Sequence, residues 1–316
     1  MTRTETINTL YSTTFARSKK KTINQTFLAT RFLTFMAAKK KVQPKGGTEW
    51  RFPVLTGRNN TVTWVGTDGE VSTEGDDPVE IARYEPKFVV ASVKKVFVNE
   101  YKNSGPEQLI DMVDTSIKLA KNEVSQALED ALLGDGTLVN GPDGMQKLVA
   151  TVPTTSATIG GINQSDDSWW RNQTYALQGD AVDYLSKDAR HLHRLCGKFG
   201  PVPNAAFCDG DVYELIQNTL EEKHTFIDDE MKDFGWPDVV IFQGKPVIWS
   251  DSCEAGTLRF VNLDDIMLYY DPAVWFMLGD WIKAQGNINE VAHLKSALNL
   301  VAQRRATSGV LTAVDG

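Results

Sequence analysis

A long helix with a single apolar stripe is predicted between residues 104 and 134, and it limits the folds open to this chain. Ser104, Pro106 and Glu107 form a capping-box start, and Gly134 marks the end. Between them, apolar residues recur at three- and four-residue spacing, at Leu109, Val113, Ile117, Ala120, Val124, Leu128 and Ala131. Such a helix spans roughly 40 Å at about 1.5 Å per residue and needs cover on one face only. We therefore expect it to lie on a β-sheet rather than inside a helical bundle.

Strand and helix patterns alternate after this helix, which predicts an α+β chain. Strands are predicted at residues 204–207, 239–242, 244–249, 259–263 and 266–270, and a strand at 292–304 is expected to return to the long helix. Asp180 is predicted to cap one helix and Asp209 to cap another that ends at Leu220. The first of these presents Ala181, Val182, Leu185, Ala189, Leu192 and Leu195 on one face. Residues 150–168 are predicted to be an irregular surface connection.

Residues 48–98 are predicted to form an extended β arm rather than a compact domain. Residues 50–65 fit a hairpin around Thr56–Asn60, whose Gly and Asn suit a tight turn. An acidic, Gly-rich stretch follows at 68–77, and Pro86–Val98 has the composition of a long strand. The arm has no core of its own, so we expect only neighbouring subunits to cover its apolar side chains, Trp50, Phe52, Val62 and Trp64.

Charge divides the chain into a basic N-terminal arm and an acidic body. Residues 1–45 contain ten Lys/Arg and one acid, a net charge of +9, whereas the remaining 23 bases and 40 acids give −17. The clusters Lys19–Lys21 and Lys39–Lys41 suit binding to phosphates or to the acidic bodies of sister subunits, and a solvated tail is the alternative. A dedicated nucleic-acid reader is disfavoured because its basic face normally dominates the domain.

Length and cysteine content exclude several classes of protein. At 316 residues the chain is long enough for two domains, and its three cysteines do not suit a disulfide scaffold, so we expect a reduced, intracellular protein. No apolar run reaches the roughly 18 residues of a membrane span. The longest candidate, residues 27–38, is interrupted by Arg31. The Arg/Lys- and Thr-rich N-terminus resembles a transit peptide in composition but has no secretory apolar core.

Motifs of known chemistry are weak or missing, so we predict no enzymatic activity, cofactor or metal. His191, His193, Cys196 and the distant His224 invite a metal site, but residues 191, 193 and 196 cannot share one helical face. Cys208 follows a predicted strand, as some nucleophiles do, but no nucleophile signature surrounds it, and a small buried core residue fits better. The acidic clusters 228–230 and 264–265 lack partner motifs, and Trp169 and Trp170 suit either a core or an interface.

The order of these parts resembles a tailed-bacteriophage major capsid protein of the Hong Kong 97-type fold. Local sequences that support the resemblance are LLGDG at 132–136, SWWRNQ at 168–173 and GKPVI at 244–248. The resemblance implies a basic N-terminal arm at 1–45, an extended β-hairpin loop at 46–97, and a peripheral domain with a spine helix at 98–150. An α/β axial domain at 151–289 and a return strand of the peripheral domain at 290–316 complete the implied fold.

The function implied by the resemblance is self-assembly through pentamers and hexamers into an icosahedral shell around double-stranded DNA. A scaffolding protein, a portal and a cement protein are possible partners, and the protein is expected in virions assembled in the host cytoplasm. The residues expected at subunit interfaces or the lumen are Lys19, Lys20, Lys21, Lys39, Lys40, Lys41, Trp50, Phe52, Arg58 and Trp64. An encapsulin-like compartment and a hydrolase with a site near Cys208 are the alternatives. Self-linking relatives use a lysine in the extended loop, and this chain has none between Arg51 and Pro86.

Overall fold

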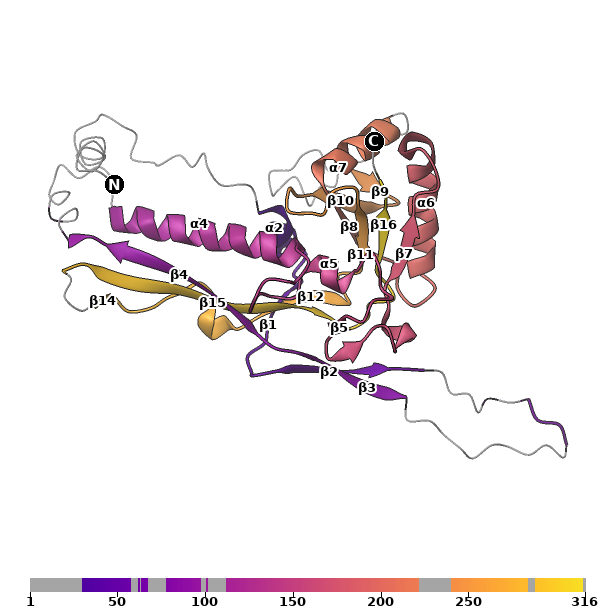
Figure 1. Ribbon diagram of the computed structural model, residues 1–316, viewed down its shortest axis with the longest axis horizontal. Helices are drawn as coiled ribbons and strands as arrows, with labels where there is room; N and C mark the ends of the chain where they lie inside the picture. Colours follow the sequence, from indigo (N-terminus) through magenta and orange to yellow (C-terminus); the bar gives the residue numbers. More distant parts are fainter. Residues whose placement is uncertain are drawn as a thin grey trace.

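The computed structural model describes residues 30–57, 62, 64–67, 78–97, 101, 112–221, 240–283 and 288–314 (Figure 1). Two β-sheets with helices packed against them make up the body, and a two-stranded ribbon projects from it. The α+β class predicted from the alternating patterns is confirmed. Within the described residues, no helix has both the length and the apolar composition that crossing a membrane requires.

The first sheet is built around one long central strand, β15 (Glu290–Ala302). This strand pairs antiparallel with β4 (Lys87–Lys95), β12 (Ile266–Tyr270), β13 (Met277–Leu278) and β14 (Ile282–Lys283). A short strand, β1 (Val42–Pro44), joins β12 in parallel. The register between β15 and β4 runs from Glu290 opposite Lys95 to Leu298 opposite Lys87. The predicted return strand is therefore confirmed, and it lies at the centre of the sheet.

The long helix α4 (Met112–Leu133) lies along this sheet, as predicted (Figure 1). Its buried stripe repeats every four residues, at Ala120, Val124, Leu128 and Leu132, and faces β4 and β15. The helix ends just before Gly134, whereas the predicted capping box at 104–107 lies outside the described residues. A short helix, α5 (Met145–Leu148), follows. Its N-cap must be glycine, because a Cβ on Gly144 would lie 1.9 Å from the Gly134 carbonyl oxygen.

The second sheet has one helical face and one face turned to the first sheet. Its strand order is β7 (Gln173–Ala176), β16 (Gly309–Thr312), β11 (Leu258–Val261), β8 (Ala205–Cys208), β10 (Lys245–Trp249) and β9 (Ile241–Phe242). Successive side chains of β8 alternate between the faces. Ala206 and Cys208 pack with helices α6 (Ala181–Cys196) and α7 (Gly210–Glu221), whereas Phe207 joins the core shared with α4.

Both predicted helix caps are confirmed in this sheet's helices. Asp180 accepts the Val182 N–H at 3.3 Å, and Asp209 accepts the Val212 N–H at 3.3 Å. The predicted apolar face of α6 is partly wrong, because Val182 is 65% exposed and Leu195 is only half-buried. The buried stripe of α6 instead consists of Ala181, Leu185, Ala189, Leu192 and Cys196, and these residues make the contact of the helix with the sheet.

The segment predicted as an irregular surface connection is exposed or half-buried over most of its length, and its buried residues lie between positions 159 and 164. It contains the short strands β5 (Thr158–Ile159) and β6 (Ile162–Asn163) and the 3₁₀ turn η1 (Ser168–Trp170), and a second 3₁₀ turn, η2 (Pro272–Val274), lies elsewhere. Ile159 and Ile162 are buried. Trp170 is also buried, and its indole N–H donates to the Ile159 carbonyl at 2.9 Å. Trp170 is thus a core residue, one of the two roles predicted for it. The surface prediction holds for residues 150–158 but is wrong for Ile159 and Ile162, where the segment meets β3 through a hydrogen bond from the Arg83 N–H to the Gly160 carbonyl at 2.8 Å.

Arg305 holds the turn between β15 and β16 against this segment. Only 1% of the residue is exposed, and its guanidinium donates to the carbonyls of Leu148 at 2.7 Å and Trp170 at 2.9 Å. It also donates to the side chains of Gln164 at 3.0 Å and Asn172 at 3.2 Å. Burial lowers the pKa of Arg305 to about 10, so the group stays charged at neutral pH. Four neutral acceptors, rather than a carboxylate, therefore stabilise this charge.

The predicted N-terminal arm contains a helix that belongs to the core, α2 (Arg31–Ala38). Phe32, Phe35 and Met36 are buried, and both phenyl rings meet Phe207 edge-on at 5.2 and 5.9 Å between centroids. The Arg31 guanidinium lies 3.2 Å from the centre of the Trp249 ring. The basic N-terminal arm predicted at 1–45 is therefore part of the core over residues 31–38.

Glu129 on α4 caps helix α2 across the core. Thr30 is the N-cap residue of α2, but its side chain makes no capping hydrogen bond. The buried Glu129 carboxylate instead accepts the Phe32 N–H at 2.7 Å and the Leu33 N–H at 3.0 Å. Burial is the main reason that the pKa of Glu129 is raised above its ordinary value. A helix start normally capped by a neighbouring residue is thus held by a side chain 97 residues away.

The projecting ribbon differs from the predicted hairpin. Strand β2 (Trp50–Leu55) pairs with β3 (Val79–Tyr84), so the hairpin predicted over residues 50–65 is wrong, and residues 58–60 of its predicted turn lie outside the described residues. Pairing Trp50 with Tyr84 and Phe52 with Ala82 puts one apolar face of the ribbon against the body.

Strand pairing does not follow the segment boundaries predicted from the sequence. Strand β4, assigned to the extended loop at 46–97, lies in the first sheet, and β12, assigned to residues 151–289, lies there too. Strand β16, assigned with the return strand at 290–316, lies in the second sheet between β7 and β11. The chain crosses between the sheets several times, which a division into consecutive segments cannot represent.

Candidate subunit-interaction surfaces

The outer face of the ribbon is apolar and uncovered. Because side chains alternate along a strand, the residues that point away from the body are Arg51, Pro53, Leu55, Val79, Ile81 and Arg83. Leu55 lies opposite Val79 and is 72% exposed, and Pro53 lies opposite Ile81. Contiguous exposed apolar side chains of this kind mark surfaces that another molecule covers.

The connection beyond the ribbon carries further exposed apolar residues. Trp64 is fully exposed, and Val62 and Val65 are also exposed. The sequence prediction that Val62 and Trp64 have no cover from their own chain is confirmed for the monomer. Arg58, another predicted contact, lies outside the described residues.

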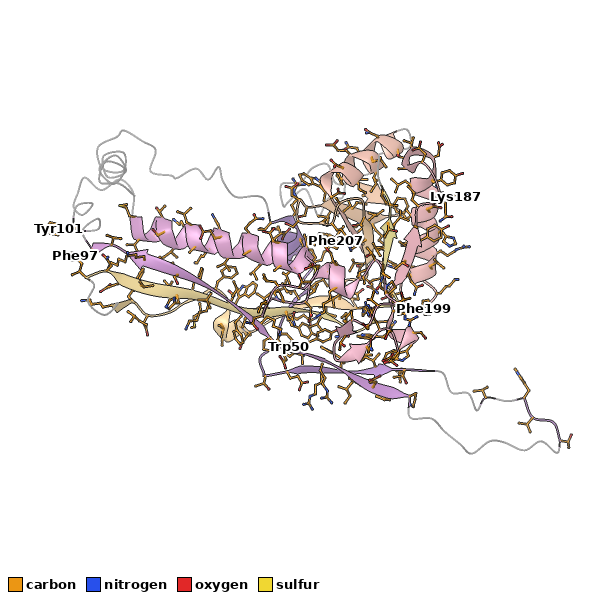
Figure 2. The ribbon with its side chains drawn as sticks, viewed as in Figure 1. Trp50, Phe97, Tyr101, Lys187, Phe199 and Phe207 are labelled. Atoms are coloured by element: carbon orange, nitrogen blue, oxygen red, sulfur yellow. The ribbon has the colours of Figure 1, made fainter. Side chains whose placement is uncertain are left out.

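Trp50 and Phe52 were also predicted to need cover from a neighbour, and for Trp50 this is wrong. Trp50 is 5% exposed, its indole N–H donates to the Lys45 carbonyl at 3.1 Å, and its ring meets Tyr269 at 5.4 Å (Figure 2). Phe52 is half-buried with its ring 5.7 Å from the same tyrosine. Both side chains lie on the inner face of the ribbon and fasten it to β12.

The predicted lysine clusters are divided by the structure. Lys19, Lys20 and Lys21 lie outside the described residues. Lys39 follows the end of α2, Lys40 has a left-handed backbone with φ of 54°, and Lys41 forms an ion pair with Asp264. Lys41 therefore pairs within its own chain, so it is not available as the free cation that the sequence suggested.

A third apolar surface, on the first sheet opposite α4, was missed by the sequence analysis. Phe88 is 67% exposed on β4, and Val90, Met277 and Ile282 are exposed on the same face of neighbouring strands. A signal for it exists in the sequence, because residues 88–91 are apolar without a break. Such a run indicates a strand that is covered on both faces, and α4 covers only one.

A groove of about 580 Å³ separates the ribbon from the body. The end of β2 and residues 56–57 form one wall, and Trp169, Phe199 and Arg304 stand on the other. Figure 2 shows Phe199 on the side of the body that faces the ribbon. The groove continues the apolar outer surfaces and is open to a partner.

Cys208 does not have the properties of a nucleophile. It is completely buried between the second sheet and its helices, and burial raises the pKa of its thiol well above the ordinary value. A buried neutral thiol is inert. Among the described residues, no group of three or more His, Cys, Asp or Glu side chains is placed to bind a metal, and His224 lies outside them.

Comparison of the sequence with family models and with curated proteins gives no match. Comparison of the structure gives many. The capsid of cyanophage A-1(L) aligns with a TM-score of 0.72 at 16% identity, over 95% of this chain and 96% of that one. The SrpI encapsulin of Synechococcus elongatus PCC 7942 aligns with a TM-score of 0.64 at 14% identity, over 95% and 93%.

A structure of Phage G major capsid and decoration proteins contains a chain that aligns with a TM-score of 0.54 at 9% identity, over 96% of both chains. At such low identities the likeness concerns the fold, and it extends over almost the whole length of each chain. The resemblance drawn from the order of elements is confirmed: the chain has the Hong Kong 97-type fold.

Proposed function

We propose that this protein is a major capsid protein that assembles through pentamers and hexamers into an icosahedral shell around double-stranded DNA. The observation that carries the proposal is the ribbon, which projects from the body and whose outer face leaves Leu55, Val79 and Ile81 exposed among the described residues. A monomer gains nothing from such a surface, whereas repeated copies can bury it. The similar fold of the cyanophage A-1(L) capsid supports this reading.

In this proposal the first sheet and α4 form the peripheral domain, and the second sheet with α6 and α7 forms the axial domain. The basic N-terminal residues contact neighbouring subunits or packaged DNA, and no enzymatic activity, cofactor or membrane is required. A scaffolding protein, a portal and a cement protein are proposed partners. The presence of decoration proteins with the Phage G capsid supports the last of these.

Electron microscopy and light scattering of the purified protein test assembly directly. We expect closed shells or rings of five and six subunits at high protein concentration. A monodisperse species of 35.1 kDa at every concentration and ionic strength contradicts the proposal.

An encapsulin-like compartment is the second candidate, because the SrpI encapsulin aligns over most of both chains. Particles purified from the native source distinguish the two functions. A capsid contains DNA that is protected from nuclease, whereas a compartment contains protein cargo and no protected DNA.

Trp64 and Trp50 provide a matched pair of variants for the ribbon. Trp64→Ala is expected to change the unfolding free energy of dissociated subunits by less than about 0.5 kcal/mol, because the side chain is fully exposed. The same variant should raise the concentration needed for assembly about tenfold or more if Trp64 is an interface anchor. Trp50→Ala should instead destabilise the subunit by about 3 to 5 kcal/mol, because its side chain is buried. Denaturant unfolding and light scattering measure the two effects, and normal assembly of the Trp64 variant contradicts the interface role.

Covalent linkage between subunits is not expected. The ribbon and its connection contain no lysine between Arg51 and Pro86, and a guanidinium that stays protonated is a poor nucleophile. Lys45 lies five residues before β2 and Lys87 three residues after β3, so both flank this stretch at the base of the ribbon. Particles boiled in detergent and reductant should therefore run as monomer on a denaturing gel. A ladder of multimers containing a Lys–Asn linked peptide is the opposite result.

A further inference from the structure

A basic groove lies along α6 in a chain whose body is strongly acidic. Lys187, Arg190 and Arg194 are exposed on this helix and line, together with Tyr175 and Gln178 beside them, a groove of about 350 Å³. Figure 2 shows Lys187 on the outer flank of the second sheet, away from the ribbon. Outside the N-terminal 45 residues the chain has a net charge of −17, so a cluster of three cations here is unusual.

The three cations of the groove have no acidic partner among the described residues. Arg190 donates to the carbonyl and hydroxyl of Ser186 at 2.9 and 2.7 Å, and Arg194 lies 3.2 Å from the Nδ1 atom of His191. Lys187 lies over the ring of Tyr184 at 5.3 Å. The one carboxylate in the lining, Asp188, is buried and accepts the Gln178 N–H at 2.9 Å. The groove therefore presents positive charge to a partner.

The sequence contains an acidic segment of suitable length, residues 222–239. It has six acids and two lysines, a net charge of −4, with Asp228, Asp229 and Glu230 adjacent to one another. The chain leaves the end of α7 at Glu221 and returns at Val240, whose N–H donates to the Tyr213 hydroxyl at 3.1 Å. Both ends of the segment are thus attached to α7, which is about 18 Å long at about 1.5 Å per residue. Eighteen residues can span about 60 Å when extended, so the segment can reach about 20 Å beyond its anchors.

We propose that the basic groove on α6 of one copy receives the acidic segment 222–239 of a neighbouring copy. This inference rests on the proposed function and identifies one of its contacts. Copies with acidic bodies repel one another, so a contact between them requires a patch of opposite charge. Because the groove and the segment are different surfaces, the contact is heterologous, and repetition of a heterologous contact gives a closed ring when the rotation between copies allows it. The segment is favoured over nucleic acid because every copy carries it and because it is long enough to reach about 20 Å beyond its anchors.

Charge reversal on each side, alone and combined, tests the contact. The groove variant carries Lys187→Glu, Arg190→Glu and Arg194→Glu, and the segment variant carries Asp228→Lys, Asp229→Lys and Glu230→Lys. At about 0.15 M salt, each variant alone should leave at least tenfold less protein in particles, because like charges then face each other. The combined variant should restore assembly toward the wild-type level. Sedimentation and electron microscopy measure the assembled fraction, and restoration shows that the groove variant folds.

A control variant changes the net charge equally at sites away from the groove. Lys118, Lys121 and Lys283 are exposed, and their replacement by Glu should leave assembly close to wild type. Any of three results overturns the inference. The control loses as much assembly as the groove variant, the groove or segment variant assembles normally, or the combined variant does not recover assembly. Normal particles with less nucleic acid assign the groove to nucleic acid and also overturn it. If the wild-type protein itself never assembles, the proposed function is what fails.

Discussion

Replacing Glu129 with alanine is expected to lower the unfolding free energy of the subunit by about 2 to 4 kcal/mol. The change removes the acceptor for the N–H groups of Phe32 and Leu33 and leaves a buried cavity between α2 and α4. Helix α2 should then loosen, and amide exchange at Phe32 and Leu33 should accelerate. Denaturant unfolding and hydrogen exchange on dissociated subunits measure both effects.

Asp130→Ala is the matched control for this variant, because Asp130 is the next residue of α4 and is exposed. It should change stability by less than about 0.5 kcal/mol. If Glu129→Ala is as mild as this control, Glu129 does not hold α2.

The stability contributed by Glu129 should also depend on pH in a defined direction. Burial raises the pKa of this carboxyl above its ordinary value of 4.5, so the folded state binds the proton more tightly than the unfolded chain. The contribution is therefore largest below the unfolded pKa and declines as pH rises through the raised folded pKa. The stability of wild type relative to Glu129→Gln, measured at a series of pH values, should fall as pH increases above about 4.5. An advantage that grows with pH contradicts this assignment.

Arg305→Met is expected to cost at least about 3 kcal/mol of unfolding free energy. The variant keeps an apolar side chain but leaves the carbonyls of Leu148 and Trp170 and the side chains of Gln164 and Asn172 without their donor. Arg305→Lys should recover little, because an ammonium group cannot donate in the planar geometry of a guanidinium. Thermal and denaturant unfolding of dissociated subunits measure the loss.

Arg304→Met is the control for Arg305, since Arg304 is the adjacent residue and is exposed. A change below about 0.5 kcal/mol is expected for it. Similar effects of the two substitutions would show that the buried hydrogen bonds do not stabilise the subunit.

The sequence predicted those parts of the fold that depend on local patterns. The apolar repeat at Ala120, Val124 and Leu128 and the caps Asp180 and Asp209 have short-range physical causes, and the structure confirms them. The predicted next position, Ala131, is only half-buried, and Leu132 is buried instead. Strand partners depend on contacts between distant residues. Trp50 has an apolar, β-favouring run close by at residues 61–65, but its partner is Tyr84, and nothing local distinguishes the two. The same limit explains why β4 and β16 were placed with the wrong neighbours.

The sequence predicted the candidate surfaces only where the exposure of a side chain follows from its neighbours in the sequence. Trp64 is exposed, as expected. Trp50 has a similar composition around it, yet the packing of its ring on Tyr269 buries it. The ion pair between Lys41 and Asp264, which lie 223 residues apart, could not be predicted from the local sequence either. The unbroken apolar run at 88–91 did carry a signal for the uncovered face of the first sheet.

The central position of β15 has a consequence for how the chain is synthesised. This strand pairs with four others in the first sheet, and β16 lies between two strands of the second. Neither sheet can be completed before residues 290–312 have been synthesised. Contacts such as that between the Tyr84 hydroxyl and the Ala302 carbonyl join residues 218 positions apart, a high contact order that slows folding. Folding therefore finishes only after these residues leave the ribosome. A chain that ends before residue 290 therefore lacks the middle strands of both sheets and cannot complete either of them.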